Sequence, residues 1–461
     1  MLKTSIMSIV SINPTSGEQI KTYDTLTLDD VNRKIEQTHQ AWNSWKKSGH
    51  AERSRLLTNM AGVLRKHRQP LATLMANEMG KPVIQGLDEI EKCAVCCEYY
   101  AANAPAHLAD RVIETEASRS YASFQPLGVI LAVMPWNFPL WQVFRFLAPA
   151  LAAGNCGVLK HASNVPGCAL AIEQIVNEAG FPEHVFQTLL IGSNLIDKVI
   201  ENQHIKAVTL TGSNNAGIAV ASKAGTFLKR TVLELGGSDA YVVLADADLE
   251  HAAETCVGSR LINSGQSCIA AKRFIVEAPV AEAFTQMFLK KMQEKVVGDP
   301  LALSTDVGPQ ARQDLRDELH NQVLKSIEKG ASCILGGTVA PGKHAFYPPT
   351  ILTNVQPGMP AYDEELFGPV ASIITAKDEA DALRIANDSD FGLGSAVFTS
   401  NKEKGENIAR NILEAGSSYV NERVKSDPRL PFGGIKNSGY GRELSSFGIH
   451  EFVNIKTVYI K

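Results

Sequence analysis

The run Gly128–Val133, GVILAV, is short and entirely apolar, which is typical of a parallel strand covered on both faces. Downstream of it, apolar runs alternate with stretches of helical periodicity. Helices are expected over 144–153 and 166–179, and strands over 156–160 and 207–210. Strands that alternate with helices in this way predict a parallel, doubly wound α/β sheet.

The composition is that of an ordinary globular protein. Hydrophobic residues make up 44% and charged residues 20% of the 461 residues, close to the average for globular domains. A chain of this length is expected to form two or three domains with a sizeable core. The 45 Lys and Arg residues nearly balance the 49 Asp and Glu residues, for a formal net charge of −4. We therefore expect no nucleic-acid partner.

The N-terminal residues 1–12, MLKTSIMSIVSI, contain one Lys and a short apolar run. No small-residue cleavage site follows, and the run is too short to cross a bilayer. Eight cysteines without a paired spacing indicate reduced thiols. These features predict a cytoplasmic protein that does not contact a membrane.

Three cysteines, Cys93, Cys96 and Cys97, lie close together in the sequence. Their spacings of three and four residues place them on one helical face, with Ile90 and Val95 nearby. Cysteine is among the most frequently buried residue types. We interpret the three as a packed core stripe rather than as metal ligands, and no metal site is expected.

The stretch Leu261–Lys272, LINSGQSCIAAK, places Cys268 among small polar residues. This setting is typical of a loop that presents a sulfur atom, and we interpret Cys268 as a catalytic nucleophile. A free cysteine more often serves as a small buried hydrophobe. We expect that more common role for the other seven cysteines.

A second stretch, Val232–Ala240, reads VLELGGSDA and contains Glu234 between two leucines. A carboxylate in such apolar surroundings is partly desolvated, which raises its pKa and suits a general base near neutral pH. The alternative is a Glu at a strand end that faces water.

Together the two stretches resemble the two active-site patterns of the aldehyde dehydrogenase superfamily, and the resemblance extends over nearly the whole chain. Within that superfamily the sequence is most similar to succinate-semialdehyde dehydrogenases. The resemblance implies NAD(P)-dependent oxidation of an aldehyde to a carboxylic acid through a cysteine thioester. Cys268 would be the nucleophile and Glu234 would activate the hydrolytic water. The side chain of Asn137, in PWNFP, would bind the oxyanion together with the backbone amide of Cys268.

The same resemblance implies a Rossmann-type cofactor domain, an α/β catalytic domain and a small β oligomerisation element. We expect residues 1–110 and 132–235 in the NAD(P)-binding domain, 236–431 in the catalytic domain, and 111–131 with 432–461 in the oligomerisation element. The C-terminal segment alternates like an edge strand, whose unpaired amides a partner subunit would cover. A homodimer or homotetramer is therefore expected.

The turn TGSNNAG, residues 211–217, follows an apolar strand and precedes an expected helix, so a phosphate could bind its backbone amides. By resemblance this turn lies near the cofactor pyrophosphate, Lys160 binds the adenosine ribose, and Glu365 with Phe367 contacts the nicotinamide ribose. The expected cofactor-binding residues are Trp136, Lys160, Ser163, Gly212, Ser213, Glu365 and Phe367.

Ser163 differs from the commonest family pattern, which has Glu at this position to bind both ribose hydroxyls. Loss of that negative charge removes the repulsion of a 2′-phosphate. The sequence therefore predicts that either NAD or NADP can serve as cofactor.

Arg145 lies eight residues after Asn137, on a helix expected to follow the substrate tunnel. In succinate-semialdehyde dehydrogenases an Arg occupies this position, and a buried guanidinium needs an anion such as a carboxylate. The resemblance therefore favours succinic semialdehyde as substrate. A second Arg common in those enzymes is Ile262 here, and the segment 421–431 could supply the missing contact.

Two alternatives remain open. Arg145 can pair with an internal Asp or Glu instead, in which case the substrate is an uncharged aldehyde of the lactaldehyde or aminoaldehyde type. A non-catalytic binding protein on the same fold is the third possibility, and the retention of every catalytic group disfavours it.

Overall fold

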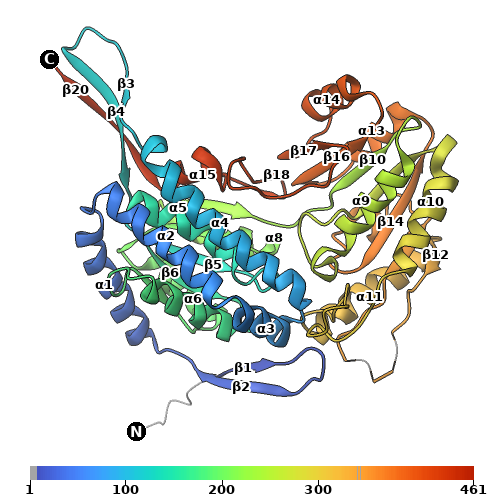
Figure 1. The fold of residues 1–461 in the computed structure, drawn as a ribbon, viewed down its shortest axis with the longest axis horizontal. Helices are drawn as coiled ribbons and strands as arrows, with labels where there is room; N and C mark the ends of the chain where they lie inside the picture. Colours follow the sequence, from blue (N-terminus) through green and yellow to red (C-terminus); the bar gives the residue numbers. More distant parts are fainter. Residues whose placement is uncertain (1–7, 340, 343) are drawn as a thin grey trace.

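Two large sheets lie in the left and right halves of the computed structural model in Figure 1, which describes residues 8–339, 341–342 and 344–461. The first seven residues of the N-terminal apolar run lie outside the described residues. All strands of the first sheet except β19 run parallel. Its order is β19 (Gly439–Tyr440), β9 (Arg230–Glu234), β8 (Ile205–Thr211), β5 (Val129–Met134), β6 (Cys156–His161) and β7 (Phe186–Thr188).

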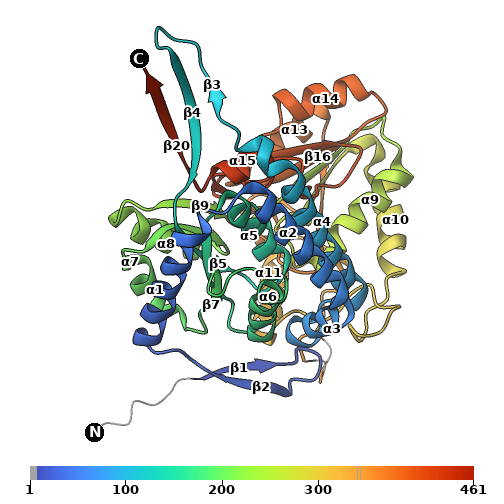
Figure 2. The same ribbon diagram turned by 60° about the vertical axis from the view of Figure 1, so that its left-hand side comes forward.

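Helices cover both faces of this sheet because each strand is apolar on both sides. The helix α5 (Trp141–Ala153) is buried along its whole length, beneath the outer α2 and α4 (Figures 1 and 2). The remaining helices of this half are α1 (Leu28–Trp45), α2 (His50–Lys66), α3 (Arg68–Met79), α4 (Val83–His107), α6 (Pro166–Glu178), α7 (Ile196–Glu201) and α8 (Asn214–Thr226).

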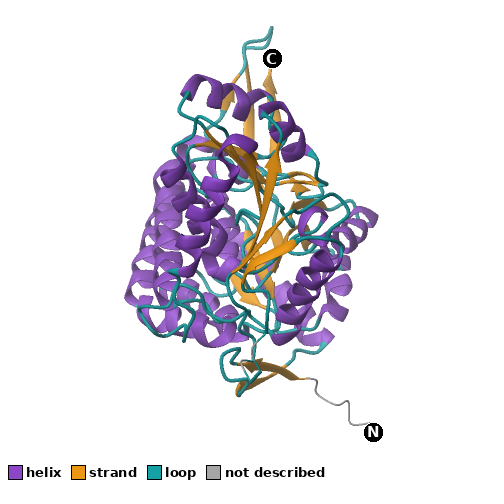
Figure 3. Cartoon of the chain, turned by 90° about the vertical axis from the view of Figure 1, so that its right-hand side faces the viewer, coloured by secondary structure: helices purple, strands orange, loops and turns teal. Residues whose placement is uncertain are grey.

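The second sheet has seven strands, all parallel except β12. Viewed in Figure 3, helices lie on both sides of the strands. Its order is β12 (Ser332–Leu335), β13 (Thr350–Thr353), β14 (Val370–Ala376), β11 (Arg273–Glu277), β10 (Ala240–Val243), β16 (Gly394–Phe398) and β17 (Ser417–Val420). Its helices are α9 (Leu249–Leu261), α10 (Ala278–Gln293), α11 (Gln313–Glu328), α12 (Pro360–Asp363), α13 (Glu379–Asn387) and α14 (Lys402–Asn411).

A third sheet of three antiparallel strands extends away from the body and ends near the C-terminus (Figures 1 and 2). Its order is β20 (Val453–Ile460), β4 (Arg119–Pro126) and β3 (Arg111–Val112). The remaining elements are the hairpin β1 (Ser8–Ile12) and β2 (Gln19–Asp24), the short pair β15 (Phe391–Gly392) and β18 (Ile435–Lys436), and α15 (Ser445–His450).

The α/β fold with two doubly wound sheets and a small β element is therefore confirmed. The domain limits stay a prediction, and two strands bear on them. β5 begins before residue 132, and β19 lies after residue 431, yet both belong to the first sheet.

A proline favours a helix end at the residue before it, but α4 continues past Pro105 to His107. Proline in a helix removes one hydrogen bond and leaves the carbonyl four residues earlier without its partner. Here the hydroxyl of Ser54 donates to the carbonyl of Ala101 at 2.6 Å. That bond satisfies the carbonyl and lets the helix pass through the proline.

The cysteine stripe of α4 is buried as expected, with Cys93, Cys96 and Cys97 in the core. Val95, expected nearby, instead points outward with 43% of its surface exposed. Of the seven cysteines assigned to the core, Cys333 is the exception, being only half-buried. Within the described residues, no helix is both long and apolar enough to span a bilayer.

Candidate active site

The carboxyl ends of parallel strands in the first sheet gather at one edge. Pro135 follows β5, Gly212 follows β8 and Leu235 follows β9, and all three line a cavity of about 290 Å³. Cys268 reaches the same cavity from the second half of the chain. We call it the Cys268 cavity.

The loop before Cys268 has an unusual backbone. Asn263, Ser264 and Gly265 have φ angles of 53°, 57° and 77°, a left-handed run that costs about 1 to 3 kcal/mol for each non-glycine residue. At Gly265 a side chain is also excluded, because a Cβ would lie 2.2 Å from the carbonyl oxygen of Gly368. The turn therefore brings the chain against the Gly368 segment, and Cys268 follows it.

Lys272 holds the other side of the loop. Its ammonium donates to the carbonyl oxygens of Ser267 at 2.8 Å and Cys268 at 2.6 Å, and lies 3.2 Å from Oε1 of Glu365. Only 1% of the side chain is exposed, so these three oxygens replace the water that the charge has lost. The cysteine loop and Glu365 are thereby joined.

The PWNFP segment opposite is fixed by two further residues. Nε2 of His161, at the end of β6, donates to the carbonyl oxygen of Pro139 at 2.8 Å, and burial lowers the pKa of this imidazole to about 4. The Asn263 side chain donates to the carbonyl of Asn137 at 2.6 Å. The Asn137 amide itself donates to the carbonyl of Gln266 at 3.2 Å and has a second N–H.

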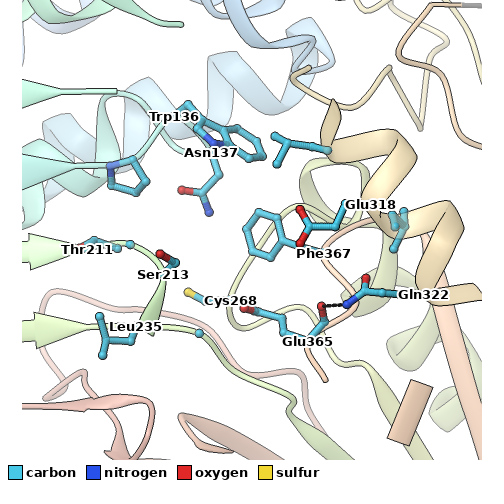
Figure 4. A pocket seen from close by; sticks show the side chains of 15 residues that line it. Trp136, Asn137, Thr211, Ser213, Leu235, Cys268, Glu318, Gln322, Glu365 and Phe367 are labelled. Atoms are coloured by element: carbon cyan, nitrogen blue, oxygen red, sulfur yellow. Dashed lines mark hydrogen bonds between the residues drawn. The ribbon is translucent and has the colours of Figure 1, made fainter. Parts of the chain in front are cut away.

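Most of the predicted cofactor residues meet at this cavity, as Figure 4 shows. The rings of Trp136 and Phe367 pack edge to face, 5.7 Å between centroids. The hydroxyl of Ser213 caps α8 by accepting from the amide of Ala216, so the free amides of this helix N-terminus lie at the cavity. The predicted site residues that line it are Trp136, Asn137, Gly212, Ser213, Cys268, Glu365 and Phe367.

Lys160 and Ser163 do not line the Cys268 cavity. Lys160 lies at the end of β6, where burial lowers the pKa of its ammonium. Ser163 is exposed and, with Asn164 and Arg312, lines a separate cavity of about 530 Å³. The structure therefore does not bring these two residues to the sulfur, and their role in binding the adenosine end stays a prediction.

Glu234 ends β9 and is 2% exposed. Neither carboxylate oxygen has a hydrogen-bond partner among the described residues, and Oε1 faces Gly433. Burial raises the pKa of this carboxyl well above its usual range, and the nearby Glu443 adds to the effect. The water-facing alternative is thus wrong, and the carboxyl can hold or accept a proton near neutral pH.

The Cys268 thiol is also desolvated, which raises its pKa to about 12, although the positive charges of Arg145 and Lys272 oppose this rise. Attack by the sulfur therefore requires a proton acceptor. Glu365 and Glu234 are the carboxylates that act on its pKa. Glu365 already pairs with Lys272, Glu234 does not line the Cys268 cavity, and the catalytic role of Glu234 stays a prediction.

Arg145, expected to anchor a substrate carboxylate, forms a buried ion pair with Glu443. Its guanidinium also donates to Thr211 at 3.4 Å and lies 4.7 Å from the ring of Phe432. It does not line the Cys268 cavity. The internal ion pair weighed from the sequence is therefore present, and contact of Arg145 with substrate stays a prediction.

A second cavity, of about 410 Å³, adjoins the same two backbone segments. Phe138 and Ile269, which line it, are the chain neighbours of Asn137 and Cys268. Ile262 also lines it, as do Arg423 and Lys425 of the segment expected to supply a substrate contact. We call it the Phe138 cavity.

Sequence reasoning missed three residues that organise the site. Lys272 was assigned no role, although a charged residue that follows the apolar run Ile269–Ala271 is a usable signal. His161 carries no local signal of its bond to the carbonyl of Pro139, which lies on another segment. Glu443 carries no local signal, because its partner Arg145 lies far away in the sequence.

The model for the aldehyde dehydrogenase family matches residues 2–458. The chain belongs to this family. It is 50% identical over 454 residues, 98% of this chain and 100% of the relative, to a Synechocystis protein named "Probable succinate-semialdehyde dehydrogenase (NADP+)". The Escherichia coli succinate semialdehyde dehydrogenase (NAD(P)+) Sad is 44% identical, covering 100% of this chain and 99% of that one.

Solved structures of the family share the fold. The succinic semialdehyde dehydrogenase of Streptococcus pyogenes, solved in complex with NADP+, superposes with a TM-score of 0.96 at 37% identity, over 98% of this chain and 99% of that chain. In this chain, the free amides at the start of α8 suit a phosphate. The rings of Trp136 and Phe367 suit a flat ring. These features fit a nicotinamide dinucleotide.

The left-handed turn before Cys268 gives a first prediction. Gly265→Ala places a Cβ against the Gly368 carbonyl, and overpacking with backbone strain should lower the free energy of unfolding by about 2 to 4 kcal/mol. Urea unfolding measures this change. Gly225→Ala in α8, where nothing lies within 4 Å of the added Cβ, is the control and should be neutral or slightly stabilising. Equal stability of both variants would contradict the role of this turn.

Proposed function

We propose that this protein oxidises succinic semialdehyde to succinate, with NADP or NAD as the hydride acceptor. Full-length similarity to succinate-semialdehyde dehydrogenases at 44 and 50% identity carries the proposal. The groups on Cys268, Asn137 and Glu234 support it. A thiol nucleophile, an amide that donates to the oxyanion and a carboxyl of raised pKa are the groups needed to form and hydrolyse a thioester.

In the first step the sulfur of Cys268 attacks the aldehyde carbon, forming a carbon–sulfur bond as the carbonyl electron pair moves to oxygen. The thiol proton passes to Glu234. The free N–H of the Asn137 amide stabilises the resulting oxyanion. The backbone N–H of Cys268, which has no acceptor within the described residues, is the second donor.

A bound nicotinamide dinucleotide supplies the acceptor for the hydride that leaves the former aldehyde carbon. Trp136, Gly212, Ser213, Glu365 and Phe367 would hold it at the cavity. Lys160 and Ser163 would bind the adenosine ribose, and a neutral Ser163 leaves room for the 2′-phosphate of NADP.

Hydrolysis then releases the acid. Glu234 first releases the thiol proton to solvent and then takes a proton from water, and the hydroxide adds to the thioester carbon. The carbon–sulfur bond breaks, Cys268 leaves as the thiolate, and a carboxylic acid forms. One aldehyde, one water and one oxidised dinucleotide thus yield one acid, one reduced dinucleotide and one proton, and the proton left on Glu234 returns to the Cys268 thiolate. The base must be ionised for this step, so its rate should rise with pH through the raised pKa of Glu234.

The second candidate is an aldehyde dehydrogenase for uncharged substrates. The ion pair between Arg145 and Glu443 favours it, because a guanidinium already neutralised attracts a substrate carboxylate less strongly.

Arg145→Met distinguishes the two candidates. If Arg145 binds the substrate carboxylate, the variant should lower kcat/KM for succinic semialdehyde roughly a hundredfold, the value of one charge-assisted hydrogen bond, and change butanal far less. Steady-state kinetics with both aldehydes measure this. Arg53→Met removes another buried guanidinium, one that donates to the carbonyl of Ala152, and controls for general loss of packing. Equal losses on both aldehydes would show that Arg145 is structural.

We also propose that the protein is a homodimer or homotetramer. The third sheet supports this proposal, because β20 is an edge strand whose Ile455 and Tyr459 are 60% and 50% exposed. Val112 of β3 is 66% exposed. An exposed apolar edge strand favours pairing with another chain.

Light scattering after gel filtration tests the assembly. The wild type should have two or four times the monomer mass, and Ile455→Asp should shift it toward the monomer because a charge then lies on the edge strand. Val296→Asp, at a similarly exposed aliphatic residue outside this sheet, should leave the mass unchanged. A monomeric wild type would overturn the proposal.

A further inference from the structure

Two side chains near the start of α4 reach the two segments that carry the reacting sulfur and the oxyanion donor. Gln85 and Glu89 are one helical turn apart and therefore lie on the same face of the helix. Both line the Phe138 cavity. The Asn137 amide and the Cys268 sulfur face one other cavity (Figure 4), so the spacing of their two segments decides whether they act together.

Glu89 holds the segment that follows Asn137. Its Oε1 accepts from the backbone amides of Leu140 and Trp141, both at 2.9 Å. These amides begin α5, and the first N–H groups of a helix have no partner within the helix. A carboxylate at this place satisfies two of them and complements the helix dipole.

Lys81 completes this contact. Its ammonium pairs with Oε2 of Glu89 and lies 3.7 Å from the ring centroid of Phe138. The two charged side chains are 0% and 1% exposed. An ion pair buried this deeply adds little stability over apolar residues of the same volume, so stability alone does not account for it. The pair contacts the chain directly after Asn137 at two places.

Gln85 holds the cysteine loop. Its Oε1 accepts from the backbone amide of Asn263 at 2.6 Å. Asn263 begins the left-handed turn that precedes Cys268, and its side chain donates to the carbonyl of Asn137. Asn263 thus links the loop held by Gln85 to the segment held by Glu89.

The start of α4 is itself fixed to the second half of the chain. Nε2 of Gln85 donates to the carbonyl of Asp306 at 3.2 Å, and the amide of Val83 donates to the carbonyl of Pro300 at 2.7 Å. Both acceptors lie on the connection between α10 and α11. This end of α4 is therefore a fixed support for segments from both halves of the chain.

We propose that Gln85 and Glu89 are positioning residues, which set the distance between the Cys268 sulfur and the Asn137 amide. With that distance fixed, the free N–H of Asn137 meets the oxyanion that forms as the sulfur adds to the aldehyde carbon. This inference rests on the proposed function, because it assumes thioester chemistry at Cys268. Neither Gln85 nor Glu89 lines the Cys268 cavity, so both act through the segments that they hold.

Glu89 is tested in a Lys81→Met background, so that no buried ammonium is left unpaired. Glu89→Gln keeps an oxygen that accepts from the Leu140 and Trp141 amides, whereas Glu89→Met has a similar shape without that acceptor. With succinic semialdehyde and saturating NADP+, kcat of the Met variant should be roughly 10- to 100-fold below that of the Gln variant, since a misplacement of about 1 Å can cost a hundredfold. KM should change less than about threefold, because the oxyanion forms only after the sulfur adds.

Two further readouts separate positioning from general damage to the site. Alkylation of Cys268 by iodoacetamide forms no oxyanion, so its rate should differ less than about threefold between the two variants. In Asn137→Ala, which lacks the donor, the same two variants should differ less than about threefold in kcat, because the changes act through one group. A fall in alkylation equal to the fall in kcat, or an undiminished difference in Asn137→Ala, would overturn the proposal.

Glu78 provides the matched control. It is also buried, and it also accepts from two amides at the start of a helix, those of Gly167 and Cys168 in α6, at 2.9 Å each. Compared with Glu78→Gln, Glu78→Met should unfold at a lower temperature, while its kcat with saturating NADP+ stays within about threefold. A loss of kcat as large as that at Glu89 would replace positioning with a general loss of stability.

Gln85→Met tests the other contact of the same helix face, at a half-buried position that needs no change of background. Loss of the bond to the Asn263 amide should lower kcat roughly 2- to 13-fold, the range of one neutral hydrogen bond. An unchanged kcat would overturn the role of this α4 face, whether or not the Glu89 variants fold.

Failure of this inference differs from failure of the proposed function. If the wild type prefers another aldehyde to succinic semialdehyde, the substrate is wrong. The same variants compared on that aldehyde still decide the inference, because attack on any aldehyde forms an oxyanion. If the wild type oxidises succinic semialdehyde and the Gln and Met variants at Glu89 have equal kcat, the inference is wrong and the function stands.

Discussion

The ammonium of Lys272, bonded to the carbonyls of Ser267 and Cys268 and paired with Glu365, is the interaction on which the site depends. A cation this deeply buried is stable only while its oxygen partners stay in place. It therefore fixes the loop that carries the sulfur to the carboxylate expected to contact the cofactor. The left-handed turn at Gly265 and the Asn263 bond to Asn137 complete the same frame.

Around this frame, burial sets the acid–base properties of the reacting groups. Desolvation raises the pKa values of the Cys268 thiol and the Glu234 carboxyl together. The carboxyl is therefore a better proton acceptor than an exposed glutamate, and the thiol still needs an acceptor before it attacks. Two buried cations of the site have carboxylate partners: Arg145 pairs with Glu443 and Lys272 pairs with Glu365.

The sequence was sufficient for features whose signal is local. A few neighbouring residues are enough to recognise the apolar run of β5, the position of Cys268 among small polar residues, and the position of Glu234 between leucines. The pairing of Arg145 with Glu443 could not be predicted, because it depends on two residues distant in sequence that only the tertiary fold brings together. The continuation of α4 past Pro105 could not be predicted for the same reason, since Ser54 of another helix donates to the carbonyl that the proline leaves without a partner.

Intact-protein mass spectrometry of Glu234→Gln tests the central claim most directly. A glutamine can take neither the thiol proton nor the proton of the hydrolytic water, so the thioester should form slowly, from the small thiolate fraction, and then persist. Prolonged incubation with succinic semialdehyde and NADP+ should leave one succinyl group on the protein, mapped by proteolysis to Cys268, with one NADPH formed per chain. The same variant carrying Cys268→Ala should gain no mass. Normal turnover without an adduct, or an adduct on another residue, would contradict a thioester at Cys268 that Glu234 resolves.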